Sequence, residues 1–168
     1  MVVRLLVFFG LVVAAFGGLC RTPWVNSGAS CYLFVTHMKE SWAESVSMCT
    51  ELGGYLVEIQ SQQENNFLID YATNHLHIHT GGPSGNGSFW IGGTDMLVEG
   101  NWFWLSTNQK FAFTDWYVTS HEPNGGIHEN CAHLGSHLHF HWNDAECHIL
   151  YNFICETESL GGGPDVVG

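Results

Sequence analysis

Short hydrophobic blocks, separated by polar and glycine-rich turns, predict a protein that combines several strands with a few helices. A run of four or five apolar or aromatic residues bounded by turn formers is typical of a buried strand. We expect the runs at 131–134 and 139–142 to be neighbouring strands joined by a turn at Gly135-Ser136. The expected strands are residues 31–35, 55–59, 89–92, 102–105, 131–134, 139–142 and 151–155.

Two other segments carry the signature of a capped helix, a Ser followed three residues later by a Glu. Ser41 and Glu44 open the first segment, and Ser61 and Glu64 open the second. We expect the first helix to stop at Gly53-Gly54, because glycine tolerates the backbone conformation at a helix end. The expected inner faces are Trp42, Val46 and Cys49 on the first helix, and Phe67, Leu68 and Tyr71 on the second.

Two stretches have little helical or strand periodicity. Residues 74–88 are polar and rich in Gly, and they include the sequon Asn86-Gly87-Ser88, which predicts N-glycosylation of Asn86 in an exported chain. Residues 106–130 form a longer irregular stretch, which is unusual in a compact domain and indicates a functional loop.

The chain begins with Arg4, an apolar run at 5–15 and small residues near Gly17, the pattern of a secretory signal peptide. A membrane anchor would need about 20 apolar residues, and this run is shorter. We therefore expect a signal peptide at 1–17, one folded domain at 20–156, and a Gly-rich flexible tail at 157–168. The product is expected to be secreted, with no membrane insertion.

The chain contains six cysteines, all of which follow the expected signal peptide. An even number in an exported chain predicts three disulfides, but six cysteines allow 15 pairings. A zinc cluster is disfavoured because no paired C-x-x-C spacing is present. The cysteines are Cys20, Cys31, Cys49, Cys131, Cys147 and Cys155.

The formal net charge is −12, with 16 Asp and Glu residues against four Lys and Arg. Nucleic acid is excluded as a partner because its phosphates require a Lys- and Arg-rich footprint. Anionic membrane surfaces are disfavoured for the same reason. High acidity suits calcium binding, although it also serves solubility.

Oxygen-bearing side chains gather between residues 122 and 144. Glu122-Pro123-Asn124, Glu129 and Asn143-Asp144 supply three carboxylates and two side-chain amides. Carboxylate and amide oxygens are the ligands that Ca²⁺ selects, and three carboxylates held together repel one another unless a cation neutralises them. The sequence therefore predicts a calcium site, with a sugar as the expected partner.

A set of motifs occurs in a definite order and spacing from Cys20 to Glu156. The motifs are Cys31-Tyr32, the two capped helices, Phe89-Trp90-Ile91-Gly92, Glu99-Gly100-x-Trp102-x-Trp104, Trp116, Glu122-Pro123-Asn124, Glu129-x-Cys131, Trp142-Asn143-Asp144 and Cys155. By the order and spacing of these motifs, this part of the chain resembles the C-type lectin-like domain. It is most similar to the small secreted lectins of invertebrates, including the perlucin-like type.

The resemblance implies an α+β fold, in which two helices flank small antiparallel sheets with a long calcium-binding loop. It also implies three disulfides, namely Cys20–Cys31 of the long form, Cys49–Cys155 and Cys131–Cys147. Closing the long loop through Cys49–Cys155 would stabilise the fold by roughly 4–5 kcal/mol in the chain-entropy model.

The resemblance further implies which residues hold the ion and the sugar. The Pro123 peptide bond would be cis, turning Glu122 and Asn124 toward one point. Two vicinal sugar hydroxyls would complete the Ca²⁺ shell and form hydrogen bonds with the same side chains, donating to the carboxylates and accepting from the Asn amides. The implied metal and sugar ligands are Glu122, Asn124, Glu129, Asn143 and Asp144.

The Glu-Pro-Asn motif resembles the mannose-type selector, which favours mannose, N-acetylglucosamine, glucose and fucose. A galactose-type selector would read Gln-Pro-Asp. The family also has an auxiliary calcium site. Asp95 and Glu99 match two of its carboxylates, but Gly125 stands where that site needs an acid, so we do not expect a second ion.

Eleven histidines are many for this length. His137, His139 and His141 alternate, which predicts one face of a strand that continues to Asn143. We expect His141 to contact the sugar, and His139 with His141 form an alternative zinc site. His121 and His128 adjoin predicted ligands, which suggests pH-dependent binding. Polar surface filling is the simpler interpretation.

The leading hypothesis is a secreted, calcium-dependent lectin that recognises microbial or self glycans in innate defence. The alternative is an extracellular-matrix or shell biomineralisation protein, although no acidic run is present. An enzyme is not expected, because the chain lacks H-E-x-x-H and a nucleophile elbow. Use of the scaffold for ice or protein binding stays open. One sugar site binds weakly, so avidity would require a homo-oligomer formed through domain surfaces.

Overall fold

A computed structural model describes residues 20–80 and 86–160 of the chain, and all structural statements concern these residues. The helical elements are α1 (Trp42–Glu51), α2 (Gln62–Asp70), a π-helical turn η1 (Tyr71–His75), and the 3₁₀ turns η2 (Gly126–His128) and η3 (Ser136–Leu138). The strands are β1 (Val25–Ser27), β2 (Ser30–Glu40), β3 (Tyr55–Leu56), β4 (Phe89–Thr94), β5 (Phe103–Trp104), β6 (Cys131–Leu134), β7 (Trp142–Ala145) and β8 (Tyr151–Glu158).

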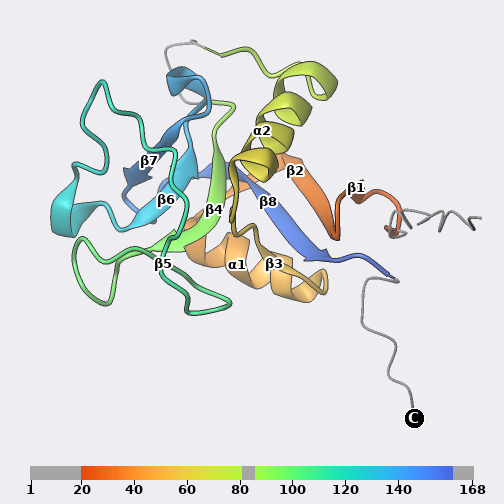
Figure 1. Ribbon diagram of the computed structural model, residues 1–168, viewed down its shortest axis with the longest axis horizontal. Helices are drawn as coiled ribbons and strands as arrows, with labels where there is room; N and C mark the ends of the chain where they lie inside the picture. The colour runs from red at the N-terminus through yellow and green to blue at the C-terminus, as the bar shows by residue number, and fades with distance from the viewer. Residues whose placement is uncertain (1–19, 81–85, 161–168) are drawn as a thin grey trace, which may run out of the picture.

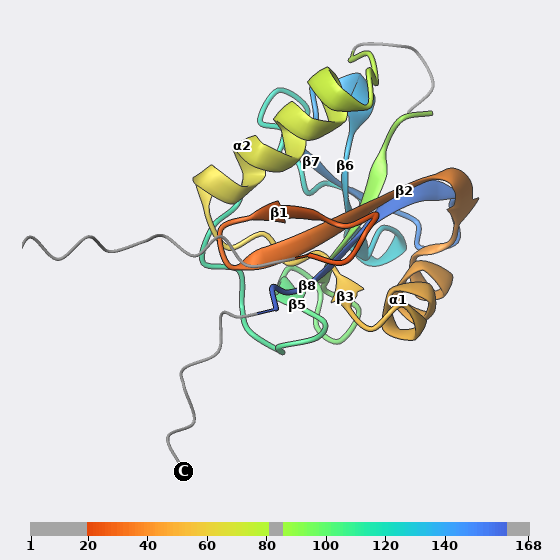
Figure 2. The same cartoon turned by 90° about the vertical axis from the view of Figure 1, so that its right-hand side faces the viewer.

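The strands join into one connected sheet in the order β1-β2-β8-β4-β6-β7, with β3 paired to β8 and β5 paired to β4. All pairings are antiparallel except β4 with β8, which is parallel. The two helices lie on opposite sides of the sheet, as Figure 1 and Figure 2 show. The expected α+β architecture with two flanking helices is therefore confirmed.

Local capping signals place both helices correctly. The Ser41 side chain accepts a hydrogen bond from the Glu44 amide, and the Glu44 carboxylate accepts one from the Ser41 amide, so this capping box is complete. In α2 the Ser61 side chain also accepts from the Glu64 amide. The Glu64 carboxylate, however, accepts from the Gln60 backbone amide at 2.8 Å, and its other oxygen accepts from the Tyr32 hydroxyl at 2.8 Å.

Three disulfides fix the sheet and the first helix. Cys20 bonds Cys31 at the N-terminal hairpin, Cys49 ties α1 to Cys155 in β8, and Cys131 bonds Cys147 around β6 and β7. These are the pairs that the family resemblance implies. Trp90, Trp104 and Trp142 are the largest fully buried side chains of the core.

The predicted strand at 139–142 is wrong. After β6 the chain makes a 3₁₀ turn, and His139 and Phe140 take left-handed backbone conformations with φ of 56° and 64°. The Leu138 and Phe140 amides both bond the Gly135 carbonyl, which closes a tight turn and drives the Phe140 ring into the core. Strand β7 starts only at Trp142, so the three alternating histidines do not share a strand face.

Several other boundaries differ from expectation, those of β2, β3 and β8 the most. Strand β2 runs on to Glu40 and β3 stops at Leu56. Strand β8 continues to Glu158, two residues past the expected domain end at 156, because β2 pairs with it along this length.

The expected signal peptide at 1–17 and most of the expected tail lie outside the described residues. Within the described part of the chain, no helix has the length and apolar character needed to cross a membrane.

Candidate functional site

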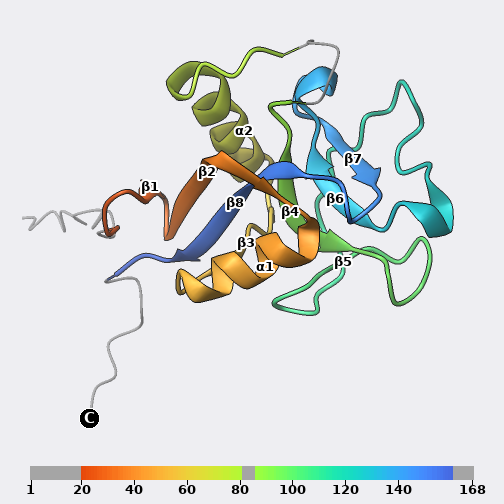
Figure 3. The same cartoon turned by 180° about the vertical axis from the view of Figure 1, so that it is seen from behind.

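The irregular stretch after β5 is held to the core by aromatic rings. Phe111 stacks on Trp104 with ring centroids 4.1 Å apart, and Trp116 packs against Trp102 at 4.8 Å. Trp116 also forms a single bridge to Trp142 at the start of β7. These contacts place the stretch beside β6 and β7, at the end of the molecule opposite β1, as Figure 3 shows from behind.

A buried amide on α2 adds a polar anchor. Asn65 is fully buried, accepts a hydrogen bond from Trp142 Nε1 at 2.9 Å, and donates one to Asp115 Oδ2 at 2.8 Å. The other Asp115 oxygen lies 3.1 Å from His141 Nδ1. One amide thus connects α2, the irregular stretch and β7. Sequence reasoning missed Asn65; its only signal is a polar residue three positions before Leu68 on the inner helix face.

The Glu122–Pro123 peptide bond is cis, as the family resemblance implies. Around it, the Ser120 hydroxyl donates to Glu122 Oε1 at 2.6 Å, and Asn124 Nδ2 donates to the Ser120 carbonyl at 3.0 Å. Ser120 therefore holds the side chains on both sides of the proline.

Asp144 connects this turn to β7. Its carboxylate is almost fully buried. Oδ1 accepts a hydrogen bond from the backbone amide of Asn124 at 3.1 Å, and Oδ2 accepts one from the backbone amide of Gly125 at 2.8 Å. Gly125 must remain small, because a Cβ there would lie 2.2 Å from Glu129 Cβ. The geometry therefore brings Glu122, Asn124, Glu129 and Asp144 together.

The surroundings of Glu122 and Glu129 raise the pKa of both carboxyl groups. Burial raises the pKa of Glu122, and Asp144 and Glu129 raise it further, whereas the Ser120 hydroxyl opposes the shift. Burial also raises the pKa of Glu129, with added repulsion from Asp144. Glu122 Oε2 is buried without a hydrogen-bond partner. A divalent cation would neutralise the repulsion between the carboxylates and give the unpaired oxygen a partner, so the donor set fits Ca²⁺.

The fifth predicted ligand, Asn143, lies on β7 directly before Asp144. Its Nδ2 donates to the Asp144 carbonyl and lies 3.2 Å from His133 Nε2. The described residues contain no preformed group of three or more His, Cys, Asp or Glu side chains around one metal position. The Asp144 carboxylate oxygens accept from backbone amides, so the four side chains that meet do not form a closed cage, and Asn143 is joined to them only through the Asp144 carbonyl.

The two auxiliary carboxylates are also neighbours. Asp95 is buried, and its Oδ2 accepts from the Gly100 amide at 2.8 Å while Oδ1 has no partner. Desolvation raises the pKa of Asp95 and of Glu99, and Asp144 adds repulsion in both cases. The missing acid at Gly125 leaves this pair without the third carboxylate that the family pattern requires.

The histidines are arranged differently from expectation. His141 is held by Asp115, and its ring lies 5.8 Å from Tyr117. His137 and His139 are exposed and stand on the 3₁₀ turn. His133, which sequence reasoning missed, is the buried one: it packs against Trp90 and Tyr151, and burial lowers its pKa to about 3.

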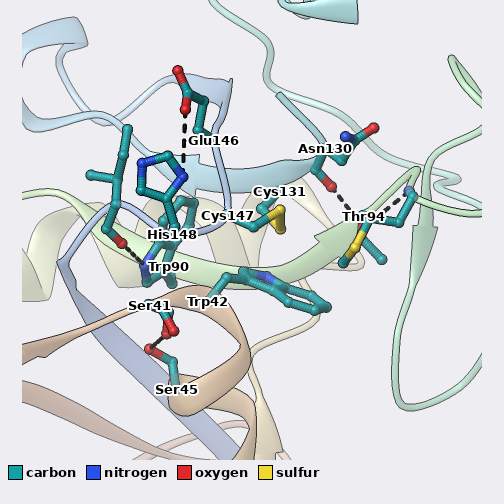
Figure 4. The surroundings of a disulfide bond; sticks show 12 residues. Ser41, Trp42, Ser45, Trp90, Thr94, Asn130, Cys131, Glu146, Cys147 and His148 are labelled. Carbon is teal, nitrogen blue, oxygen red and sulfur yellow. Dashed lines mark hydrogen bonds and ion pairs between the residues drawn. A yellow bond between two sulfur atoms is a disulfide. The ribbon is translucent and has the colours of Figure 1, made fainter. Parts of the chain in front are cut away.

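Figure 4 shows how the base of the site is fixed. The Cys131–Cys147 disulfide joins β6 to the segment after β7, beside Trp42 and Trp90. Thr94 Oγ1 donates to the Asn130 carbonyl at 2.6 Å, which anchors the residue between Glu129 and Cys131.

Asn86, the predicted glycosylation site, is exposed and its side-chain oxygen accepts a hydrogen bond from Lys39 Nζ. A cavity of about 710 Å³ opens elsewhere, between β2, α1 and η1, with Trp24, Leu33 and Met48 among its lining residues. None of the predicted ligands lines this cavity, so it is separate from the carboxylate site.

The chain belongs to the C-type lectin family, because the family model described as "Lectin C-type domain" matches residues 38–157. The fold and the three disulfides agree with this assignment. The domain is a binding module and the chain is not an enzyme.

Two relatives and one solved structure illustrate the similarity. Perlucin from Haliotis laevigata is 34% identical over 84% of each chain. The galactose-specific lectin nattectin from Thalassophryne nattereri is 32% identical over 81% of this chain and 79% of its own. The carbohydrate-recognition domain of cow CD23, crystallised with a GlcNAc2Man3 oligosaccharide, is 30% identical, with a TM-score of 0.68 over 84% of this chain and 98% of that chain.

Proposed function

We propose that the chain is a calcium-dependent carbohydrate-binding lectin that recognises glycans on microbial or self surfaces. The observation that carries the proposal is the meeting of Glu122 and Glu129 with the Asp144 carboxylate. The raised pKa values of Glu122 and Glu129, and the unpaired Oε2 of Glu122, call for a divalent cation. Membership of the C-type lectin family supports a sugar as the partner.

Each ligand would contribute an oxygen to one Ca²⁺. The ion, when bound, would neutralise the carboxylates and offer open coordination positions to sugar hydroxyls. The chain's own residues prepare the site. Asp144 holds the backbone of Asn124 and Gly125, Ser120 orients Glu122, and Asn143 extends from β7 beside Asp144. The proposed metal and sugar ligands are Glu122, Asn124, Glu129, Asn143 and Asp144.

We propose mannose-type selectivity, for mannose, N-acetylglucosamine and fucose, from the Glu-Pro-Asn motif. The cow CD23 domain, crystallised with a mannose-containing oligosaccharide, supports this choice, whereas the name of nattectin indicates galactose. The sugar panel must therefore include both classes.

Secretion belongs to the same proposal. Three disulfides are typical of an exported protein, since reducing compartments disfavour them. We propose that residues 1–17 direct export and that Asn86 carries a glycan.

Titration calorimetry on the oxidised, mature protein tests the proposal, with CaCl₂ first and then mannose or galactose in the presence of calcium. We expect calcium binding in the submillimolar to millimolar range that extracellular modules show, and mannose binding that EDTA abolishes. Glu129→Gln should lose most of both, whereas the control Glu146→Gln, which removes an exposed carboxylate nearby, should retain both. If the protein binds no calcium at millimolar concentration, the proposal is wrong.

A shell or matrix role is the second candidate, favoured by the similarity to perlucin and by the net charge of −12. Binding to calcium carbonate powder that sugars do not inhibit, and that Glu129→Gln leaves unchanged, would support it over glycan recognition.

A further inference from the structure

Strand β2 leaves part of its outer edge without a partner. Its inner edge pairs with β8, whereas β1 covers the outer edge only at residues 30–32. The chain before β1 does not continue along β2, because it returns to the Cys20–Cys31 disulfide. Within the described part of the chain, no strand therefore pairs with the outer backbone groups of residues 33–37.

This unpaired edge lies in the cavity of about 710 Å³ that is separate from the carboxylate site. Leu33 and Phe34 of β2 line the cavity, together with Met48 of α1 and Tyr71 of η1. Figure 2 looks toward this side of the molecule and shows α1 and α2 on opposite sides of β2. The cavity is therefore a slot, with an open strand edge between apolar walls on both faces of the sheet.

A slot of this kind fits another extended strand, because a strand satisfies the backbone donors and acceptors of an open edge. The incoming strand needs apolar side chains on both of its faces to meet both walls. Strand β2 itself has this pattern, since alternate residues of a strand point to opposite faces. Val35 packs in the core cluster that contains Cys49 of α1, whereas Tyr32 packs in the one that contains Leu68 of α2.

The distribution of charge favours a second copy of the chain as the source of that strand. With a net charge of −12, most of the surface repels another copy. The slot is locally neutral, because the described residues that line it include one carboxylate, Glu51, and one guanidinium, Arg21. Edge strands are commonly protected from pairing by a lysine or a proline, and residues 32–37 contain neither.

We propose that two copies of the chain pair through the β2 edge, antiparallel about a two-fold axis near Val35, so that their sheets become continuous. A two-fold arrangement closes the contact, because each copy uses the same surface. The carboxylate site lies beside β6 and β7, at the other end of the sheet (Figure 1), so pairing leaves it open in both copies. The pairing requires neither calcium nor sugar, and only its consequence, bivalent glycan binding, rests on the proposed function.

Sedimentation velocity of the mature, oxidised protein in EDTA tests the pairing with two matched variants. His37→Glu places a carboxylate at an exposed position of β2 that lines the slot, where pairing would bury it against the apolar wall of the second copy. His137→Glu is the control, because it makes the same change of charge at an exposed position on η3, outside the slot. Circular dichroism establishes that both variants are folded.

We expect a concentration-dependent equilibrium between monomer and dimer for the wild-type protein and for His137→Glu. The dimer of His37→Glu should be at least about 10-fold weaker, because a buried carboxylate without a partner is strongly unfavourable. A wild-type protein that stays monomeric up to about 1 mM, or a dimer that His37→Glu leaves unchanged, would overturn the proposal. Calcium binding by a monomeric protein would leave the lectin proposal intact.

Hydrogen exchange of the wild-type protein locates the contact without any variant. The backbone amides of residues 33–37 should exchange more slowly when the protein concentration is raised above the dimer Kd, whereas those of β6 should not change. If the protein stays monomeric while a synthetic peptide of residues 32–37 slows the exchange of these amides, the edge binds a foreign strand and the pairing of two copies is wrong.

Discussion

Glu156 is a carboxylic acid placed where ionisation is unfavourable. It is 5% exposed in β8, and it accepts hydrogen bonds from the Ser30 hydroxyl at 2.7 Å and the Glu58 amide at 3.2 Å. Burial, together with repulsion from the carboxylates of Glu64 and Glu58, raises its pKa to about 7, against the lowering effect of its hydrogen-bond donors. Tyr55 faces the same group from β3.

This raised pKa predicts a loss of stability as the pH rises. The folded protein holds the Glu156 proton up to about pH 7, whereas the unfolded chain releases it near 4.5, so folding binds more protons within that window. The free energy of unfolding should therefore fall by up to roughly 3 kcal/mol between pH 4.5 and 8 through this group.

Glu156→Gln removes the titration while keeping an acceptor for Ser30. Denaturant unfolding should show the variant more stable than wild type by roughly 1–3 kcal/mol at pH 8 and nearly equal to it at pH 4.5. The difference between the two proteins isolates Glu156 from the many histidines. A pH-independent difference would contradict the assignment.

The two residues around Pro123 carry the proposed sugar preference. Glu122→Gln with Asn124→Asp would reproduce the galactose-type selector and reverse the donor and acceptor pattern offered to the sugar hydroxyls. We expect a glycan array to show a shift from mannose-type toward galactose-type ligands, with calcium binding retained. Unchanged mannose preference would count against the roles given to both residues.

Site residues could be predicted from the sequence where a family motif identifies their positions. The ligand set came from the resemblance, and the structure brings four of its members together. Asn65 and His133 were missed because their roles depend on partners remote in sequence: Asn65 meets Trp142 across 77 positions. Nothing in the local pattern separates such a buried polar residue from a surface one.

At the scale of elements, Asn65 connects α2 to the segments that carry the site. Replacing it with Ala leaves the buried Trp142 Nε1 without its acceptor and Asp115 Oδ2 without its donor, while Asp115 Oδ1 keeps its contact with His141. We expect Asn65→Ala to lower the free energy of unfolding by about 2–3 kcal/mol, as measured by denaturant unfolding.

The control for this change is Asn66→Ala, on the exposed face of the same helix, whose side chain bonds only Gln62 within α2. Its effect should stay within about 0.5 kcal/mol. If the binding loop depends on the anchor, Asn65→Ala should also weaken calcium affinity at a temperature where the variant is folded. Equal stabilities for the two variants would show that the network contributes nothing.

Elements were predictable where local chemistry decides them. The capping serines gave both helix starts, since the cap and the helix lie within four residues of each other. The strand predicted at 139–142 was wrong because the alternation of residues there fits a strand as well as it fits the turn that is observed. In the structure the Gly135 carbonyl accepts hydrogen bonds from two backbone amides, and left-handed backbone conformations bring Phe140 into the core. The spacing of hydrophobic residues along the sequence does not reveal such a turn.

At the scale of the whole molecule, three disulfides close loops of very different length. Cys20–Cys31 and Cys131–Cys147 span 11 and 16 residues, whereas Cys49–Cys155 spans 106 and joins α1 to the central strand β8. In the chain-entropy model a cross-link stabilises by restricting the unfolded chain, and the effect grows with the logarithm of loop length.

Paired Cys→Ala replacements should therefore differ in cost. We expect losses of roughly 3 kcal/mol for Cys20 with Cys31 and roughly 5 kcal/mol for Cys49 with Cys155, in denaturant unfolding of the oxidised proteins. The proposed binding site lies at the opposite end of the sheet from the first pair (Figure 1), so calcium affinity should survive removal of that pair. Equal losses would contradict the dependence on loop length that the chain-entropy model requires.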